Sequence, residues 1–215
     1  MALRDDVYSF IKSNYKPDEP IFLSELNIPG IKEGSVRQQM MKLTEEGKIK
    51  RYIPGVYFIP TSSKLFSSST LSLDEVIEKK YMLDGDSRCG YETGIYFANL
   101  LGLTTQVPAI YNIYTNKATT DYRETQVSGV RVILRRPHCE ITNENATILQ
   151  FLDLLKEVVR ISEVEGNEQT NRLIWYMNLQ NITVESMKPY LPYYPKSIYQ
   201  NMFEVGISNG VFAQQ

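Results

Sequence analysis

The segment from Gly34 to Pro60, GSVRQQMMKLTEEGKIKRYIPGVYFIP, restricts the possible folds more than any other part of the chain. Apolar residues at its start recur at the i, i+4, i+7 spacing of a helix with one buried face: Val36, Met40 and Leu43. Ser35 is of a type that caps helix N-termini, and Gly47 has the position that glycine favours just beyond a helix C-terminus. The sequence therefore predicts a helix capped by Ser35 and ended by Gly47.

A hairpin is expected directly after this helix. Two short runs of strand-forming residues lie at 48–52 and 56–59. The tripeptide Ile53-Pro54-Gly55 between them favours a tight turn, because proline and glycine supply the backbone angles that turns require. A hairpin in this position has the place of a wing.

The residues before Gly34 complete the pattern. An amphipathic helix is predicted to end near Asn14. A short extended piece follows at 20–23, and Ser24 is a candidate N-cap for a brief helix over 25–27. Three helices followed by a hairpin predict a winged helix-turn-helix domain over residues 1–60.

Such a domain favours binding to double-stranded DNA. Arg and Gln on an exposed helix face can contact base edges, while Lys and Ser can hold phosphates. The candidate DNA-binding residues are Ser35, Arg37, Gln38, Lys42, Lys48, Lys50, Arg51 and Tyr52. Two observations count against this hypothesis. The formal net charge is −2, and three helices with a hairpin can also form a protein-interaction module.

The next part of the chain predicts a small α+β domain. Residues 61–72, TSSKLFSSSTLS, are rich in Ser and Thr and indicate a linker. A helix opening near Ser72 is expected to close at Gly85, and a second helix to stop at Gly102. Strands are predicted at 109–114, 126–127 and 130–134. Residues 73–140 are therefore expected to form a domain with antiparallel strands.

From residue 141 to 215 the pattern predicts a helical region. One helix has the apolar stripe Ile148, Leu149, Leu152, Leu155 and Val159, and two more are expected at 172–179 and 197–204. Four tyrosines lie near two prolines, at Tyr190, Tyr193, Tyr194 and Tyr199. They suit a protein interface and the cap of a small helical core equally well. The predicted fold class of the whole chain is α+β.

The sequence favours neither a metal centre nor an enzyme. His138 is the sole histidine, and Cys89 and Cys139 lack a CxxC spacing, so two free thiols in a cytoplasmic protein are expected. Five acids could hold a metal for phosphodiester cleavage: Asp84, Asp86, Glu92, Asp121 and Glu124. Glu124-Thr125-Gln126 lacks the lysine of the acid-x-Lys arrangement that a nuclease needs. We therefore expect no catalytic residues, no metal and no cofactor.

Membrane attachment is not expected either. No stretch reaches the eighteen apolar residues of a membrane span, and the N-terminal residues lack the basic and apolar regions of a signal peptide.

Several stretches together resemble one protein family. They are GVYFIP at 55–60, GYETGIYFANLLGLTTQVP at 90–108, the strand containing YTN, and the basic strand VRVILRRP at 130–137. A chain with this order, over residues 3–137, resembles the abortive-infection type E antitoxins. These are the winged-helix partners in bacterial type IV toxin–antitoxin pairs. Nothing beyond Asn143 contributes to the resemblance.

The resemblance implies an autorepressor that binds inverted repeats in its own promoter, either as a dimer or as monomers bound side by side on the DNA. It also implies an antitoxin domain that neutralises a nucleotidyltransferase-like toxin, with or without stable contact. Basic residues on the exposed surface of that domain are implicated, and the nearest candidates are Arg131, Arg135 and Arg136. Arg131 and Arg135 share a strand face only if no bulge intervenes.

Two other functions stay open from the sequence. One is a winged-helix transcription regulator with a ligand-sensing domain, and the other is a nuclease-like effector. A metabolite that raised the melting temperature would favour the regulator, and metal-dependent cleavage would favour the effector.

Overall fold

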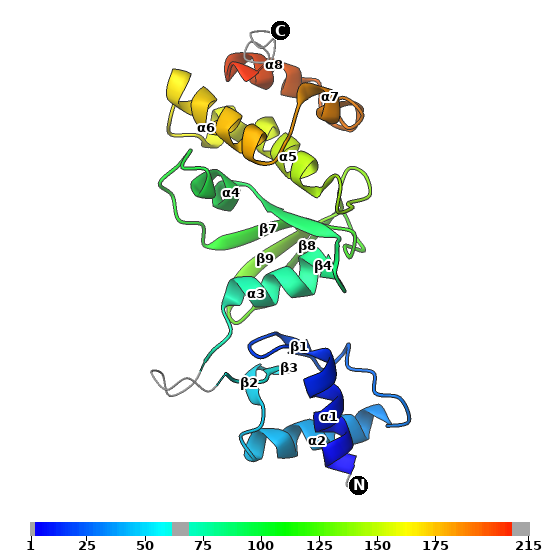
Figure 1. The fold of residues 1–215 in the computed structure, drawn as a ribbon. Coiled ribbons are helices and arrows are strands. Elements are labelled where there is room, and N and C mark those ends of the chain that lie inside the picture. Colours follow the sequence, from blue (N-terminus) through cyan, green and yellow to red (C-terminus); the bar gives the residue numbers. More distant parts are fainter. Residues whose placement is uncertain (1–2, 62–68, 208–215) are drawn as a thin grey trace. The chain divides into compact units, whose positions relative to one another are not determined.

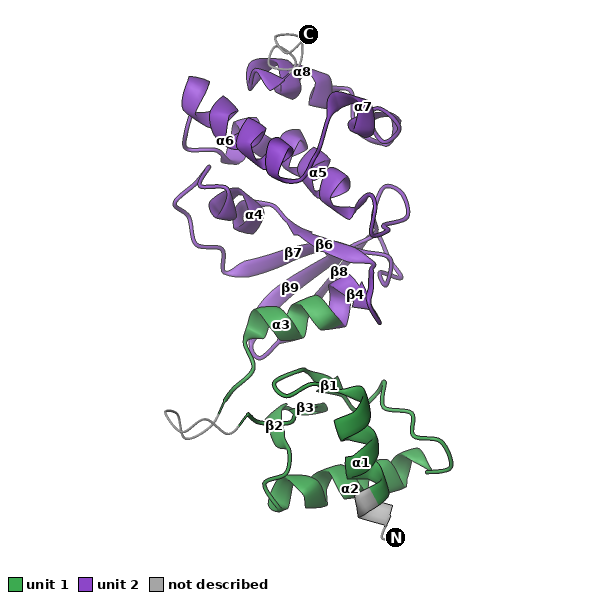
Figure 2. Cartoon of the chain, viewed as in Figure 1, with its two compact units in different colours: residues 1–79 green, residues 80–215 purple. Residues whose placement is uncertain are grey.

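The computed structural model describes residues 3–61 and 69–207. The chain divides into two compact units, residues 1–79 and 80–215 (Figure 2). Most of the linker predicted at 61–72 falls on residues 62–68, which lie outside the described residues. Within the described ranges, every helix is too short or too polar to span a membrane.

Unit 1 combines helices with a small antiparallel sheet (Figure 1). Its elements are α1 (Leu3–Asn14), β1 (Ile21–Phe22), α2 (Glu33–Glu45), β2 (Lys50–Ile53), β3 (Val56–Phe58) and α3 (Leu73–Ile77). The strand order is β1-β3-β2, so the hairpin strand β3 pairs with both neighbours. The predicted first helix, extended piece and hairpin are confirmed.

The core of unit 1 forms between α1 and α2. Val36, Met40 and Leu43 are buried, as their helical spacing predicts, and they pack with Val7 and Ile11 of α1. Burial of one face leaves the opposite face of α2 exposed to solvent.

The C-terminus of α2 also agrees with the prediction. Gly47 has a φ of 70°, which costs a glycine little. The N–H of Gly47 donates to the carbonyl of Thr44, and the N–H of Lys48 donates to that of Leu43. These are the two hydrogen bonds of a Schellman motif, which directs the chain from α2 toward β2.

Two details of unit 1 differ from the prediction. Ser35 is not the N-cap, because α2 begins at Glu33 after Lys32, whose side chain makes no capping hydrogen bond. The acidic Glu33 lies in the first turn, where a negative charge is favourable. Ser35 therefore belongs to the first turn itself, and its N–H donates to the carbonyl of Lys32.

The brief helix predicted at 25–27 is absent, since the described chain has single turns there. The N–H of Glu25 donates to the carbonyl of Phe22, and no continuous helical ladder follows. Leu26 and Ile28 are both buried, which is the two-residue spacing of extended backbone. The residue before Pro29 is also disfavoured in a helix.

Unit 2 contains a four-stranded sheet, a short hairpin and a layer of helices (Figure 1). The π-helical turn η1 (Glu78–Met82) leads into it from α3. The following elements are β4 (Leu83–Asp84), β5 (Ser87–Arg88), β6 (Gly90–Thr93), α4 (Ile95–Leu100), β7 (Ile110–Thr115), β8 (Tyr122–Val127), β9 (Val130–Arg135), α5 (Ala146–Ile161), α6 (Gly166–Leu179), α7 (Val184–Met187), η2 (Leu191–Tyr193) and α8 (Ser197–Glu204).

The two helices predicted between residues 72 and 102 are largely confirmed. Ser72 caps α3 through a capping box with Glu75. The helix continues into η1 and ends at Met82, so the predicted end at Gly85 is three residues late. The helix α4 ends before Gly102, whose φ is 70°.

The strands predicted at 109–114 and 130–134 are confirmed as β7 and β9, and the one predicted at 126–127 is the end of the longer β8. The sheet, however, is not wholly antiparallel. Its order is β6-β7-β9-β8, and β7 pairs with β9 in parallel. Val132 and Leu134 make β9 the more apolar strand of the β8–β9 hairpin, whereas β8 is mostly exposed. Burial of β9 therefore accounts for its central place beside β7, with β8 at the edge.

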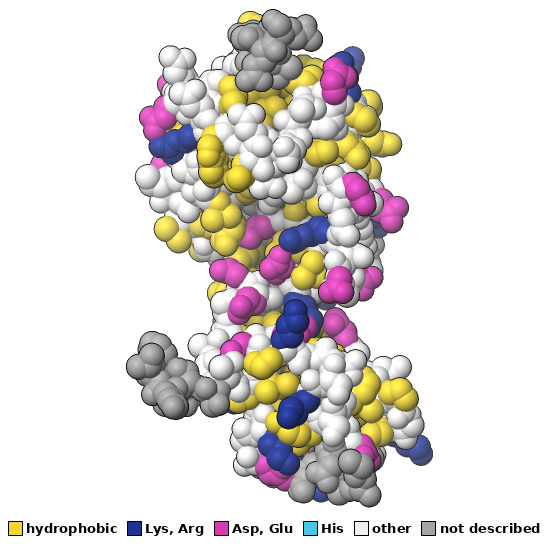
Figure 3. All heavy atoms as spheres, in the orientation of Figure 1, with side chains coloured by type: hydrophobic (Ala, Val, Ile, Leu, Met, Phe, Trp, Pro, Cys, Tyr) yellow, Lys and Arg dark blue, Asp and Glu magenta, His cyan; other side chains and the backbone are white. Residues whose placement is uncertain are grey.

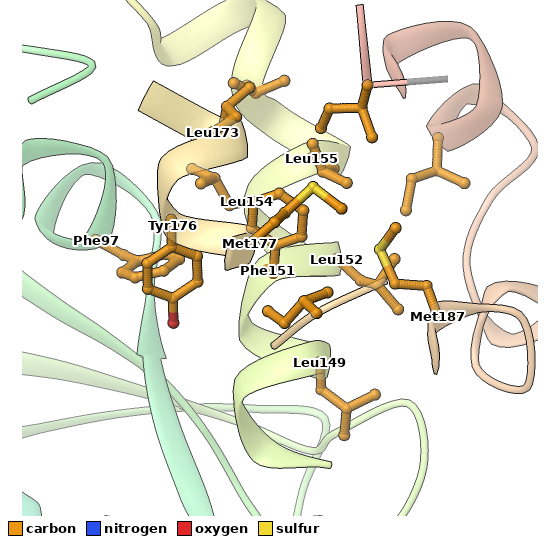
Figure 4. Close-up of a cluster of buried hydrophobic side chains, with 14 of the residues drawn as sticks. Phe97, Leu149, Phe151, Leu152, Leu154, Leu155, Leu173, Tyr176, Met177 and Met187 are labelled. Carbon is orange, nitrogen blue, oxygen red and sulfur yellow. The ribbon is translucent and has the colours of Figure 1, made fainter. Parts of the chain in front are cut away.

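The helix α5 joins the sheet to the helical layer. Leu149, Leu152 and Leu155 are buried as predicted, but Val159 of the same stripe is half-exposed. Phe151 and Leu154 are buried as well, because α5 contacts β6 and α4 as well as α7 and α8. Figure 4 shows these side chains leaving α5 in several directions.

Residues 141–215 therefore do not form a region separate from residues 80–140. One cluster of buried side chains includes Tyr91 and Tyr114 of the sheet, the whole buried face of α5, and residues of α6 and α8. The ring of Tyr176 in α6 lies 5.2 Å from that of Phe97 in α4 and 5.8 Å from that of Phe151 in α5, centroid to centroid.

Among the described glycines of unit 2, Gly90 is the one that neighbouring backbone atoms approach most closely. A Cβ atom there would lie 2.7 Å from the carbonyl oxygen of Tyr81 and 2.8 Å from that of Tyr114. Both atoms belong to the backbone, of η1 and β7, so neither can rotate away. The strand β6, which begins at Gly90, was not predicted from the sequence.

We expect Gly90→Ala to lower the free energy of unfolding of unit 2 by about 1–3 kcal/mol, the usual cost of overpacking. Urea titration followed by circular dichroism measures this loss. Gly34→Ala is the matched control, because a Cβ there meets nothing within 4 Å. It lies inside a helix and should leave stability unchanged or raise it. Equal stability of Gly90→Ala and the parent would contradict the close approach.

Candidate functional site

The exposed face of α2 carries the predicted base-reading residues. Arg37, Gln38 and Lys42 are all exposed, while Ser35 is half-buried. Arg37 lies 3.5 Å from Glu33 in a solvent-exposed i, i+4 ion pair, which holds it only weakly. The sequence missed Met41, which is 57% exposed beside these polar residues. An apolar side chain in this position could contact a thymine methyl group.

The hairpin residues differ from one another in their surroundings. Arg51 is exposed opposite Tyr57, and Lys50 is half-buried opposite Phe58. Tyr52 is half-buried in β2. Lys42, Lys50 and Arg51 have no ion-pair partner among the side chains that the structure describes, so their charges are available to an anionic ligand.

Lys48 has a more local role than predicted. It precedes β2, and its ammonium group lies 3.0 Å from Glu46 and 5.3 Å from the ring centroid of Tyr8. Lys12 of α1 lies over the same ring at 5.7 Å. Tyr8 therefore holds two cations on the surface of unit 1 through contacts with its ring.

The charge of unit 1 is balanced rather than basic. Residues 1–79 contain eleven Lys and Arg and eleven Asp and Glu. On the face drawn in Figure 3, basic and acidic side chains are interspersed. Any affinity for DNA would therefore depend on the few cations of α2 and β2, because unit 1 has no excess of positive charge that would attract DNA as a whole.

The arginines of β9 lie on a regular strand. The β8–β9 ladder runs without a bulge from Tyr122–Arg135 to Val127–Val130, so Arg131 and Arg135 share one face. Arg131 forms a bidentate pair with Glu124 at 2.7 and 2.9 Å, and Arg135 lies 5.4 Å from the ring centroid of Tyr122.

Arg136 is also bound locally. It donates to the carbonyl oxygen of Thr119 at 2.8 Å and lies 3.4 Å from Asp121. Each of the three candidate arginines therefore has a partner within unit 2.

Among the described residues, no three His, Cys, Asp or Glu side chains come together as a metal site.

The GLTTQVP stretch forms a loop that encloses a carboxylate. Glu163, just beyond α5, accepts hydrogen bonds from the N–H and the hydroxyl of Thr105 at 2.6 and 2.8 Å, and from the amide of Gln106 at 3.1 Å. The backbone N–H of Thr105 contributes most to lowering the pKa of Glu163 to about 2, followed by the Thr105 hydroxyl. Thr105 and Gln106 therefore tie this loop to the segment that follows α5.

A buried polar cluster in unit 2 was not predicted. The carboxylate of Asp153, on the buried side of α5, is 1% exposed. It accepts hydrogen bonds from the hydroxyls of Tyr91 and Tyr194 at 2.6 and 3.3 Å, and from Lys156 at 2.7 Å. Lys156 also donates to the hydroxyl of Tyr114 at 3.1 Å. These five residues, with His138, are called the Asp153 cluster below.

His138 closes the Asp153 cluster toward solvent. Its Nε2 atom lies 3.7 Å from a carboxylate oxygen of Asp153, and its side chain is 31% exposed. The ring centroid lies 5.7 Å from that of Tyr114 and 4.6 Å from that of Tyr194. Burial lowers the pKa of His138 below its ordinary value, Asp153 opposes this shift, and the charge of Lys156 adds to it.

The sequence did contain a sign of this cluster. In FLDLLKEVV, an aspartate interrupts the apolar side of a predicted helix and a lysine follows three residues later. Buried acids are usually paired.

The four tyrosines near the two prolines divide between the two roles considered from the sequence, which are a protein interface and the cap of a helical core. Tyr194 is buried and Tyr190 packs against the core, whereas Tyr193 and Tyr199 are exposed.

Both cysteines are free thiols, as predicted. Cys89 is buried and Cys139 is half-buried beside His138 in the sequence. Burial raises the pKa of both thiols, which makes them poor nucleophiles.

Comparison with known proteins adds no assignment. None of the protein-family models matches the chain, and no curated protein matches it. The function must therefore be inferred from the sequence resemblance and from the geometry of four features: α2, the hairpin, the β9 arginines and the Asp153 cluster.

We expect Asp153→Asn to destabilise unit 2 by about 3 kcal/mol, because it leaves the ammonium group of Lys156 half-buried without a counter-ion. Urea unfolding measures the change. Asp84→Asn, an exposed acid in β4, is the control and should change stability by less than about 0.5 kcal/mol. Similar effects of the two substitutions would show that the Asp153 pair contributes nothing to the fold.

Proposed function

We propose that the chain is a DNA-binding autorepressor and antitoxin, without enzymatic activity, in which unit 1 is a winged helix. The observation that carries the DNA-binding part is the pairing of an exposed α2 face with the adjoining hairpin. Arg37, Gln38 and Lys42 are available on α2, and Lys50 and Arg51 are available on β2.

The roles of these residues follow from their chemistry. Arg37 and Gln38 have the paired donors and acceptors that read base edges in the major groove. Lys42, Lys50 and Arg51 are suited to phosphates, which fix the position of a protein on DNA without reading its sequence. The absence of a helix at 25–27 leaves α2 as the single candidate recognition helix of unit 1, within the residues described.

An operator made of inverted repeats would engage two copies of the chain. Because unit 1 has no excess of positive charge, binding is expected to be weak on unrelated DNA and strongest where base contacts add to phosphate contacts.

We expect the double variant Lys42→Ala, Arg51→Ala to weaken binding to the DNA upstream of its own gene by at least about tenfold. Each lost phosphate contact should also reduce the slope of log affinity against log salt by about one. Gel-shift titrations at several salt concentrations measure both effects.

The matched control is Lys188→Ala, Lys196→Ala, which removes the same charge from exposed positions of unit 2. It should bind like the parent. Unchanged binding by Lys42→Ala, Arg51→Ala would refute the proposed interface, and specific metal-dependent cleavage of the probe would favour a nuclease-like effector instead.

The antitoxin part of the proposal rests on the resemblance of the GVYFIP, GLTTQVP and VRVILRRP stretches. Its partner would be a nucleotidyltransferase-like toxin, and the proposed location is the cytoplasm, where such a toxin acts. In unit 2 the GLTTQVP loop is held against the end of α5 by Glu163, and Arg131 and Arg135 lie on the same face of β9. Arg131 and Arg135 therefore define a surface of unit 2 on which the antitoxin role can be tested.

The proposal predicts that the gene beside this one encodes a nucleotidyltransferase-like protein, and that co-expression of the chain restores growth to cells that this protein inhibits. Arg131→Ala, Arg135→Ala should reduce this rescue while leaving operator binding intact, because both residues lie in unit 2. Lys42→Ala, Arg51→Ala should show the reverse pattern. Growth counts and gel shifts on the same variants separate the two roles. Full rescue by Arg131→Ala, Arg135→Ala would exclude this surface.

A further inference from the structure

The exposed face of α2 carries an apolar side chain near its centre. The buried residues of this helix are Val36, Gln39, Met40 and Leu43. With about 100° of rotation per residue, the direction opposite to them falls between Gln38 and Met41. Met41 is 57% exposed, so its side chain points away from the core of unit 1.

This exposure distinguishes Met41 from the rest of unit 1. Among the side chains that the structure describes there, it is the only exposed one of the Val, Leu, Ile, Met and aromatic types. A single apolar residue on a surface needs no explanation by itself. Met41, however, lies one turn after Arg37 and Gln38, the proposed base-reading residues, and helix positions three and four apart are neighbours on the surface.

The other residues of this face favour base edges over phosphates. Glu45 is exposed one turn after Met41, and phosphate groups would repel its carboxylate. In the major groove the same carboxylate could accept a hydrogen bond from a base amino group. Gly34 lies two turns before Met41 on the same side of the helix, and its missing side chain lets the backbone approach the bases closely.

We propose that Met41 is a specificity-determining residue that contacts the C5 methyl group of a thymine in the operator. This inference rests on the proposed DNA-binding function of α2. Among the four standard bases only thymine carries a methyl group in the major groove, and apolar side chains recognise it by contact. Methionine suits this contact because its unbranched, polarisable chain adapts to the shape of its partner. Met41 thus adds a preference for an A·T pair at one position of each half-site.

Replacing single thymines of the operator by deoxyuridine tests this contact, because the change removes the methyl group and keeps the hydrogen-bonding groups of the base. The probe is the DNA upstream of the chain's own gene, with one thymine replaced at a time. Gel-shift titration of the full-length chain measures the affinity. At one thymine of each half-site the parent should lose about fourfold, the effect expected for one buried methyl group.

Variants of Met41 identify the thymine that its side chain contacts. Met41→Gln keeps the length and the helix propensity of methionine, so its melting temperature should match that of the parent. It should bind the unmodified operator more weakly and should not distinguish thymine from deoxyuridine at the contacted position. Met41→Leu stays apolar and should retain the distinction. The control is Leu179→Gln, which removes a side chain of the same 57% exposure from α6 and should behave like the parent.

Two results would contradict different parts of the proposal. If the parent and Met41→Gln both bind the operator and respond identically to every deoxyuridine, the contact with Met41 is refuted and the DNA-binding function stands. If the parent shows no preference for the operator over unrelated DNA, the DNA-binding function itself is refuted.

Discussion

The packing of α5 is the interaction on which the rest of unit 2 depends. Its apolar side chains face the sheet and α4 in one direction and α6, α7 and α8 in others. Fully buried leucine and phenylalanine side chains contribute roughly 1.5–3 kcal/mol each. Burial of Asp153 among them works against this gain, because an unpaired carboxylate costs several kcal/mol to desolvate. Lys156 and two tyrosine hydroxyls offset that cost, so the polar cluster is tolerated by the packing and does not drive it.

Unit 1 has a much smaller buried apolar core than unit 2. The helix α2 packs one face against α1 and keeps the other in solvent, and a Schellman turn at Gly47 sends the chain straight into the hairpin. The buried pair Leu26 and Ile28 completes the core from extended backbone, where a helix was expected. The exposed face of α2 makes no contribution to the core, so its residues are free to differ in chemistry. Any function of that face must come from the side chains themselves.

The sequence predicted those elements whose apolar spacing and end signals agree. For α2, the stripe of Val36, Met40 and Leu43 and the glycine at 47 were sufficient, and β7 to β9 were found from alternation and turns. The errors arose where one local signal stood alone. Ser35 has capping chemistry, but the helix begins earlier at Glu33, and a three-residue segment before Pro29 is too short to sustain a helix.

Contacts between distant segments could not be predicted in this way. The parallel pairing of β7 with β9 depends on which strand of the hairpin is better buried, and the Asp153 cluster joins five separate elements or loops. Within the candidate site, helical and strand periodicity was enough to predict the exposure of four residues: Arg37, Gln38, Lys42 and Arg51. The local partners of Lys48 and Arg131 do not, because Glu46, Tyr8 and Glu124 approach them only in the folded chain.

The two units also differ in how their charged groups could serve a function. In unit 1 Lys42 and Arg51 are exposed, so an anionic ligand would gain their full charge after displacing only water and salt. In unit 2 Arg131 is paired with Glu124 and Lys156 with Asp153, so a ligand must compete there with an existing partner. Exposed cations therefore suit a surface that binds and releases nucleic acid.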